Sequence, residues 1–193
     1  MVIPLDQDGR SNLGQDELFW HDFDTRIGAS ADLVPRQVIV DMREFRSSLP
    51  SLLHARHMVL KPCTLEVGDY ILSPKMCVER KSVSDLVQSL KSGRLYVQSE
   101  AMCVHYPIPI LLIEFSQGKS FSLVFGKEEP GVVDTPSRLI LLLIHFPKLR
   151  VIWSYSPSFT AEVFQLLKVN FTSLRLLERS TRAEHGKSFG GRG

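Results

Sequence analysis

The sequence has few cysteines and no long apolar run, and both absences narrow the class of protein. Its three cysteines, Cys63, Cys77 and Cys103, are odd in number and form no Cys-x-x-Cys pair. This argues against a disulfide framework and a zinc knuckle, and a reducing compartment fits best. The longest apolar run, residues 139–144, is far too short to span a bilayer. The N-terminus carries no signal-peptide pattern, so we expect no membrane partner.

The composition is that of a globular domain with an uneven charge distribution. The chain has 193 residues, of which 44% are hydrophobic and 23% charged, with a net charge of +2. Residues 1–34 hold seven acidic side chains against two arginines, a net −5, which leaves +7 for residues 35–193. A basic body suits a polyanionic partner such as nucleic acid.

Three segments differ in their patterning. Residues 1–34 are acidic, lack periodicity and are predicted to be a flexible leader. Residues 35–169 alternate between strand and helix patterns and form the predicted domain, with an exposed loop over residues 116–133. Residues 170–193 form a basic tail that ends in a glycine-rich stretch.

The apolar periodicity of residues 35–169 predicts an α/β fold with a mixed central sheet flanked by helices. Strands are expected over residues 38–40, 59–65, 70–72, 76–81, 108–115 and 149–153, and helices over residues 47–57, 83–92, 94–105, 135–146 and 156–168. Because the first four strands are short and closely spaced, we expect them to form an antiparallel meander.

Carboxylates gather near the ends of these strands. Glu79 and Lys81 are two apart in one strand and therefore project from the same face. Asp69 lies across a short turn from them, and neighbouring strands are about 4.8 Å apart; Asp41 ends the first strand with the same outward geometry. Hard oxygen ligands select Mg²⁺, for which Mn²⁺ can substitute. Such a cation, with a lysine beside it, suits phosphodiester hydrolysis.

Each of these residues also has an ordinary structural explanation. Asp69 after Gly68 fits a turn, and Glu79 with Lys81 fits an exposed strand face. Asp85 stands three residues after Ser82, which is the spacing of a helix-capping box. The spacing of the carboxylates and the lysine alone therefore leaves both interpretations open.

The neighbouring residues make the pattern specific. The stretch resembles the nuclease domain of the XPF (xeroderma pigmentosum group F) family of structure-specific endonucleases, and the resemblance covers about residues 37–168. It rests on Val40-Asp41-Met42-Arg43-Glu44, Gly68-Asp69, Glu79-Arg80-Lys81 followed by Asp85, and Ser92-Gly93-Arg94-Leu95-Tyr96 with Gln98.

The resemblance implies a restriction-endonuclease-like fold and the cutting of duplex DNA near single-strand junctions. It implies metal binding by Asp41, Asp69 and Glu79 and a catalytic role for Lys81. Positions that support the site are matched by Arg43, Glu44, Arg80 and Asp85. Phosphate contacts are expected from Arg43, Arg46, Arg80, Lys91 and Arg94. Arg94 and Gln98 fall on a family segment near the DNA backbone.

The resemblance also implies a nuclear protein in DNA repair that pairs with a smaller non-catalytic family subunit. Family members carry a helicase-like region before the nuclease and a tandem helix-hairpin-helix domain after it, and neither pattern is visible in this sequence. The alternative is a truncated subunit that binds DNA or a partner without cutting.

Overall fold

The computed structural model describes residues 37–115 and 134–169. The predictions for the leader, the loop over residues 116–133 and the basic tail lie outside these residues.

Six strands form one twisted sheet, in the spatial order β2-β1-β3-β4-β5-β6. Their bounds are β1 Gln37–Asp41, β2 Val59–Cys63, β3 Tyr70–Ser73, β4 Met76–Ser82, β5 Ile108–Glu114 and β6 Arg150–Ser154. β3 lies antiparallel to both β1 and β4, whereas β1 with β2, β4 with β5 and β5 with β6 run parallel. The sheet is therefore mixed, as predicted.

The predicted antiparallel meander is wrong in two respects, because β2 runs parallel to β1 and β3 pairs with β1 instead of β2, which lies at the edge of the sheet. Between β1 and β2 the chain forms a 3-10 helix, η1 (Met42–Arg46), and the α-helix α2 (Leu49–Ala55). A connection of this length carries the chain back along the sheet, so the second strand can start at the same end as the first.

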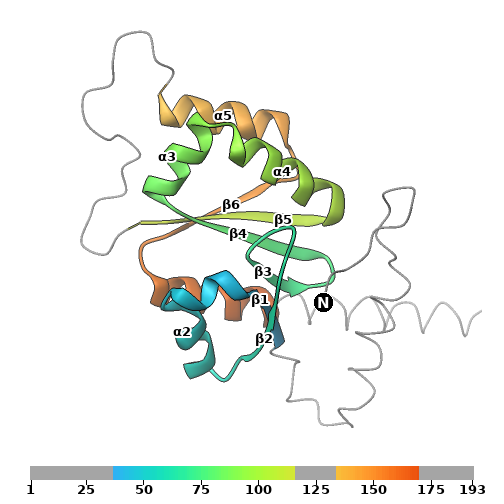
Figure 1. The fold of residues 1–193 in the computed structure, drawn as a ribbon, viewed down its shortest axis with the longest axis vertical. Coiled ribbons are helices and arrows are strands. Elements are labelled where there is room, and N and C mark those ends of the chain that lie inside the picture. Colours follow the sequence, from blue (N-terminus) through green and yellow to red (C-terminus); the bar gives the residue numbers. More distant parts are fainter. Residues whose placement is uncertain (1–36, 116–133, 170–193) are drawn as a thin grey trace, which may run out of the picture.

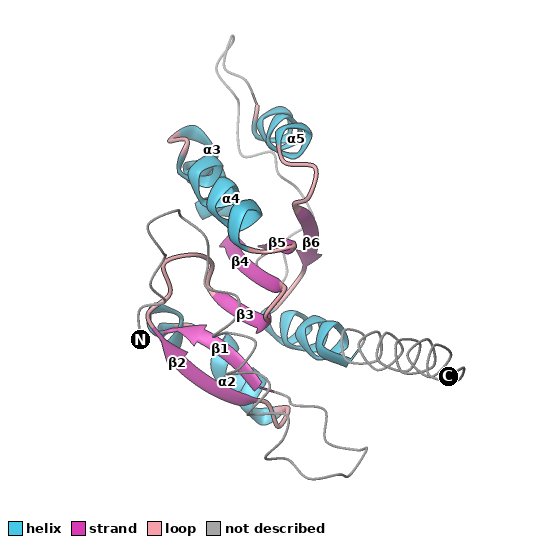
Figure 2. Cartoon of the chain, turned by 90° about the vertical axis from the view of Figure 1, so that its right-hand side faces the viewer, coloured by secondary structure: helices cyan, strands magenta, loops and turns pink. Residues whose placement is uncertain are grey.

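Helices cover both faces of the sheet (Figures 1 and 2). α3 (Val83–Lys91), α4 (Arg94–His105) and α5 (Thr135–His145) lie on one face, and α2 lies on the other beside a helix over residues 157–169. None of the described helices is long and apolar enough to cross a membrane.

Alternation along the strands divides the buried side chains between the two faces. Ile110 and Leu112 belong to the core cluster beneath α2 and the helix over residues 157–169. Leu111 and Ile113, the residues between, pack into the cluster beneath α3 and α5. The same alternation in β4 decides which polar residues near its end face the α3–α4 side.

Candidate active site

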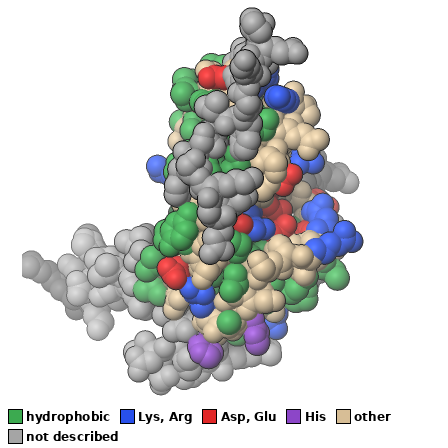
Figure 3. Space-filling model, turned by 90° about the vertical axis from the view of Figure 1, so that its left-hand side faces the viewer, with side chains coloured by type: hydrophobic (Ala, Val, Ile, Leu, Met, Phe, Trp, Pro, Cys, Tyr) green, Lys and Arg blue, Asp and Glu red, His purple; other side chains and the backbone are tan. Residues whose placement is uncertain are grey.

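A pocket of about 300 Å³ opens between the β3–β4 hairpin, η1 and α4. Acidic side chains lie beside Lys and Arg side chains in the middle of this face of the molecule (Figure 3). The pocket is lined by Arg43, Glu44, Glu66, Val67, Gly68, Asp69, Glu79, Lys81, Arg94, Gln98 and Ala101. Three of the predicted catalytic residues, Asp69, Glu79 and Lys81, therefore lie in one cavity.

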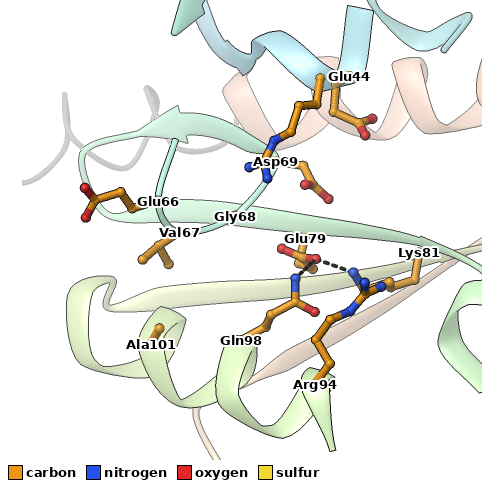
Figure 4. Close-up of a pocket in the computed structure, with 11 residues that line it drawn as sticks. Glu44, Glu66, Val67, Gly68, Asp69, Glu79, Lys81, Arg94, Gln98 and Ala101 are labelled. Atoms are coloured by element: carbon orange, nitrogen blue, oxygen red, sulfur yellow. Dashed lines mark hydrogen bonds and ion pairs between the residues drawn. The ribbon is translucent and has the colours of Figure 1, made fainter. Parts of the chain in front are cut away.

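Glu79 and Lys81 project side by side from β4, as the strand period predicts. Both are buried, at 2% and 6% exposure, and the Lys81 ammonium donates to Glu79 Oε1. Burial of a charged pair is tolerated only where each charge has a partner. Lys81 is thus held by Glu79 inside the pocket (Figure 4).

Asp69 immediately precedes β3 and is fixed by both neighbouring strands. Its backbone carbonyl accepts from Asp41 N at 2.9 Å, and its backbone N–H donates to Val78 O at 2.9 Å. Its carboxylate accepts from Arg80 N at 2.8 Å. Burial and then the negative charge of Glu79 raise the pKa of Asp69 from 3.8 to about 7. The two carboxylates therefore repel each other across the pocket.

Asp41 is placed differently from the prediction. Its side chain is 1% exposed, does not line the pocket, and accepts from Arg43 Nε at 2.7 Å and from Leu65 N at 2.9 Å. Hydrogen bonds from Arg43 lower the pKa of Asp41 to about 2, against the effect of burial. Among the described residues no three His, Cys, Asp or Glu side chains form a group that could hold a metal ion, so Asp41 is not brought together with Asp69 and Glu79.

Arg80 lies on the opposite face of the sheet from Glu79 and Lys81. Its guanidinium donates to both carboxylate oxygens of Glu114, at 2.5 and 3.2 Å, and to Glu44 at 3.4 Å. Burial alone would lower the pKa of Arg80, but the hydrogen bonds to Glu114 outweigh it and raise the pKa. The structure places Arg80 as a positioning residue, while its backbone N–H holds Asp69.

α4 contributes one face to the pocket through Arg94, Gln98 and Ala101, which stand at helical spacing. Gln98 Nε2 donates to Glu79 Oε1 at 2.6 Å. Arg94 is exposed and extends from the start of the helix toward Glu79 and Lys81 (Figure 4). The predicted DNA contact Gln98 is therefore in direct contact with a predicted metal ligand.

Asp85 and Lys91 lie outside the pocket. Ser82 Oγ donates to Asp85 Oδ2 at 2.7 Å, and Asp85 N donates back to Ser82 Oγ at 3.2 Å. Ser82 thus caps α3 as in the capping box that the sequence offered as the ordinary explanation, with the Asp85 carboxylate bound to the Ser82 hydroxyl. Lys91 is exposed in the last turn of α3.

Three further acidic residues lie near the site: Glu44, which the resemblance placed among the positions that support it, and Glu66 and Glu114, to which the sequence prediction assigned no role. Glu44 and Glu66 line the pocket, and Glu114 holds Arg80 from the end of β5. Glu66 stands three residues before Asp69, so its proximity could have been inferred from the turn. No signal in the sequence links Glu114 to Arg80, because they lie 34 residues apart.

Comparison with known proteins identifies the family. Residues 40–167 match the family model described as the ERCC4 domain. The chain is 51% identical over 176 residues to "DNA repair protein rad16" of Schizosaccharomyces pombe, which covers 87% of this chain and 20% of that protein. It is 49% identical over 180 residues to "DNA repair endonuclease XPF" of Cricetulus griseus, covering 88% of this chain and 20% of that protein. The chain thus spans about a fifth of the length of these relatives.

Solved structures agree with the fold. The chain of "XPF from Aeropyrum pernix, complex with DNA" superposes with a TM-score of 0.57 at 28% identity, over 71% of this chain and 65% of that one. A second structure, "XPF from Aeropyrum pernix", gives a TM-score of 0.60 at 30% identity, over 70% and 61% of the two chains. The resemblance to the XPF family is confirmed.

Proposed function

The chain belongs to the ERCC4-domain family, and on this premise we propose that it is the nuclease domain of a structure-selective DNA-repair endonuclease. It hydrolyses phosphodiesters of duplex DNA near junctions with single strands, in nucleotide excision repair, crosslink repair and recombination. The observation that carries the proposal is the convergence of Asp69, Glu79 and Lys81 in one pocket with Arg43 and Arg94 at its edge. A subunit that only binds DNA or a partner has no need of this set.

The site suits Mg²⁺, with Mn²⁺ as a substitute. Asp69 and Glu79 offer oxygen ligands, the kind that these hard cations prefer. Burial, and then the negative charge of Glu79, raise the pKa of Asp69, and a divalent cation beside the two carboxylates would offset both effects. When bound, the metal polarises the scissile phosphate and lowers the pKa of a water molecule.

The protein side chains supply orientation and positive charge. Gln98 and Lys81 fix Glu79 from two directions, and Arg80 N fixes Asp69. Lys81 lies in the same pocket as the two carboxylates, where its ammonium group can stabilise the negative charge that develops on the phosphate during hydrolysis. Arg43 and Arg94, both exposed at the pocket, bind the neighbouring phosphates. This electrostatic binding weakens as the salt concentration rises.

The full protein is proposed to act in the nucleus with a smaller, non-catalytic family subunit. α5 exposes Ile140, Leu141 and Ile144 at 57%, 61% and 71%, and such an apolar surface is typical of a face that a partner covers. Association of the chain with such a subunit in analytical ultracentrifugation, lost on Ile144→Glu, tests this part of the proposal.

Incision of fork-shaped DNA with Mg²⁺ or Mn²⁺ tests the activity. We expect Asp69→Ala and Lys81→Ala to abolish cutting while circular dichroism shows a folded protein. Lys75→Ala serves as the control, because Lys75 is exposed at the turn between β3 and β4, away from the pocket lining. Unchanged cutting by either pocket variant would show that the site is wrongly assigned.

A further inference from the structure

The 3-10 helix η1 presents two different exposed faces beside the pocket. In a 3-10 helix, side chains three apart lie one above the other. Met42 and Phe45 therefore share one face, and they are 61% and 45% exposed. Arg43 and Arg46 share a second face. The Arg43 side chain is 73% exposed while its Nε and Nη2 donate to Asp41, and Arg46 is exposed as well. We call these pairs the apolar face and the basic face of η1.

The third side of η1 is anchored to the sheet, so both faces are held in place. Glu44 accepts from Tyr70 Oη at 2.9 Å and from Arg80 Nη1 at 3.4 Å. Asp41 caps the first turn by accepting from Arg43 N at 2.8 Å. A short helix with fixed ends presents its exposed side chains at little entropic cost on binding.

The basic face continues directly into the catalytic pocket. Arg43 on the basic face and Glu44 on the anchored side both line that pocket, whereas Met42 and Phe45 do not. The basic face therefore lies at the pocket edge, and the apolar face lies outside the pocket on the next side of the same short helix. Hydrophobic and basic side chains border the acidic cluster on this surface (Figure 3). A nucleic acid that extends from the pocket across η1 meets positive charge first and then the exposed aromatic ring of Phe45.

The apolar face is too small for a protein partner and the right size for a nucleobase. Burying an aromatic side chain removes roughly 150–250 Å² from water, and a stable protein interface needs about 800 Å² on each side. A nucleic acid carries phosphates for the arginines and flat apolar bases for Phe45. Inside a duplex the base faces are stacked and inaccessible, whereas a junction exposes the face of the last base pair or of an unpaired base.

We propose that η1 recognises the DNA junction, with Phe45 and Met42 against an exposed nucleobase and Arg43 and Arg46 on the flanking phosphates. The inference rests on the proposed nuclease function and makes Phe45 a specificity-determining residue. Selection of the junction then comes from contact with a base face that uninterrupted duplex DNA does not offer.

The test measures binding of the 193-residue chain to fork DNA and to uninterrupted duplex DNA in the presence of EDTA, so that no cutting occurs. Fluorescence anisotropy gives both affinities, and 2-aminopurine at the junction reports stacking. We expect Phe45→Ala to weaken fork binding about tenfold, the scale of a lost base–aromatic contact. Duplex binding stays within about twofold, and the 2-aminopurine signal changes less on binding than with the unaltered chain. Phe45→Tyr, which keeps the ring, restores both fork affinity and signal.

Two control variants separate the contribution of each face. Val104→Ala removes an equally apolar side chain, 69% exposed on α4, and leaves the preference for fork DNA intact. Arg46→Ala weakens binding to both DNAs and lowers the salt slope by about one, whereas Lys75→Ala leaves both binding and salt slope unchanged. Thermal melting of each variant verifies that it is folded.

The outcomes separate this inference from the proposed function. If the unaltered chain cuts forks but Phe45→Ala keeps the full preference for fork over duplex DNA, the junction role of η1 is overturned and the nuclease function stands. Equal losses on fork and duplex DNA also overturn it, because a contact with a base face acts only at a junction. If the unaltered chain neither binds nor cuts any DNA, both proposals fail.

Discussion

Asp69 in the pocket and Asp41 outside it show how the surroundings of a side chain decide its chemistry. Asp41 receives hydrogen bonds from Arg43 and Leu65, and its pKa falls to about 2. Asp69 is desolvated and faces Glu79, and its pKa rises to about 7. Asp41 is therefore ionised and satisfied within the protein, whereas Asp69 is the carboxylate that gains most from a bound cation.

The raised pKa of Asp69 predicts a stability that falls as pH rises. The folded protein holds the Asp69 proton up to pH about 7, while the unfolded chain releases it near the ordinary value of 3.8. Between these values the folded state binds more protons, so the free energy of unfolding declines across that window. Asp69→Asn removes the titration and keeps an oxygen that can accept from Arg80 N. We expect this variant to be more stable than the unaltered chain by about 1–3 kcal/mol at pH 8, and equal to it near pH 4.

Urea unfolding in EDTA at pH 4.5, 6 and 8 measures this difference, with the midpoint read at each pH. Added Mn²⁺ raises the midpoint of the unaltered chain at pH 8 and leaves that of Asp69→Asn nearly unchanged, since ligand binding stabilises the folded state only where the site exists. A constant gap between the two proteins from pH 4.5 to 8 would contradict the pKa assignment.

The hydrogen bond between Gln98 and Glu79 predicts that a Gln98 variant loses cutting activity but keeps its affinity for DNA. Its Nε2 donates to Glu79 at 2.6 Å, so Gln98→Leu frees Glu79 to move without removing a charge. Loss of a residue that orients a metal ligand costs roughly 10–100-fold in metal affinity or activity. We expect the cutting rate on fork DNA to fall in that range, while fork affinity in EDTA changes less than about twofold. If the affinity for fork DNA fell as much as the cutting rate, Gln98 would act as the DNA contact that the sequence predicted.

At the scale of single residues, sequence reasoning succeeded where the geometry was local. Glu79 and Lys81 share a face because they are two apart in one strand, and Ser82 with Asp85 forms the expected cap. The role of Asp41 could not be predicted from the sequence, because its second partner, Leu65 N, lies 24 residues away in the chain. Its first partner, Arg43, is near in sequence, but an arginine at that distance equally fits a phosphate contact.

Among the structural elements, the turn before β3 depends on Gly68. Its φ is +75°, and a Cβ there would lie 2.1 Å from Cys77 Sγ. Gly93, at the start of α4, has the same φ of +75° but nothing within 4 Å of an added Cβ. Comparing alanine substitutions at these two glycines therefore separates the free-energy cost of backbone conformation from that of steric overlap.

We expect Gly93→Ala to lower the free energy of unfolding by about 1 kcal/mol, the conformational cost alone. Gly68→Ala adds an overlap in a packed region, for a total of roughly 2–5 kcal/mol, and displaces Asp69 enough to reduce cutting. Cys77→Ala combined with Gly68→Ala recovers part of the stability, because it removes the atom that the new Cβ meets. Urea unfolding of these three variants gives these differences, and equal costs at the two glycines would refute the steric account.

The strands and helices were predictable from periodicity, but the direction of one strand was not. The helical pattern before β2 was present in the sequence, and a helical connection of that length permits parallel pairing. The antiparallel meander was predicted from the short spacing between the first strands, which does not take account of that helical connection. The predicted mixed sheet is correct because the parallel pairs lie on either side of the antiparallel β3.

Across the whole molecule, one charged network joins the sheet to the helix over residues 157–169. Arg80 on β4 binds Glu114 on β5, and Glu114 accepts from Thr160 Oγ1 at 2.7 Å. Side-chain exposure is only 17% for Arg80 and 8% for Glu114. Such a network cannot be predicted from one sequence, because it depends on which strands become neighbours and on where the last described helix packs.

This network predicts a large and non-additive effect on stability. Glu114→Gln keeps the shape of the side chain but leaves the buried Arg80 charge with only the longer contact to Glu44, at 3.4 Å, as a counter-charge. Breaking one partner of a buried pair costs about 3–5 kcal/mol, and we expect the lower end because the Gln oxygen can still accept one hydrogen bond. Arg80→Met together with Glu114→Gln removes both charges and costs less than the sum of the single changes. Arg80 N still holds Asp69 in each variant, since that bond comes from the backbone.

A second ion pair to the same helix provides the comparison that decides whether burial is the cause. Arg56 binds Glu162 at 2.8 Å, with side-chain exposures of 23% and 53%. Solvent screens such a pair, so Glu162→Gln lowers the free energy of unfolding by less than about 1 kcal/mol, and its double-mutant cycle with Arg56→Met shows little coupling. Urea unfolding of both cycles gives the two coupling energies under one condition. A coupling for Arg80 and Glu114 no larger than that for Arg56 and Glu162 would mean that the buried network does not join the two layers, and that packing of Phe164 and Ala161 on the sheet holds the helix alone.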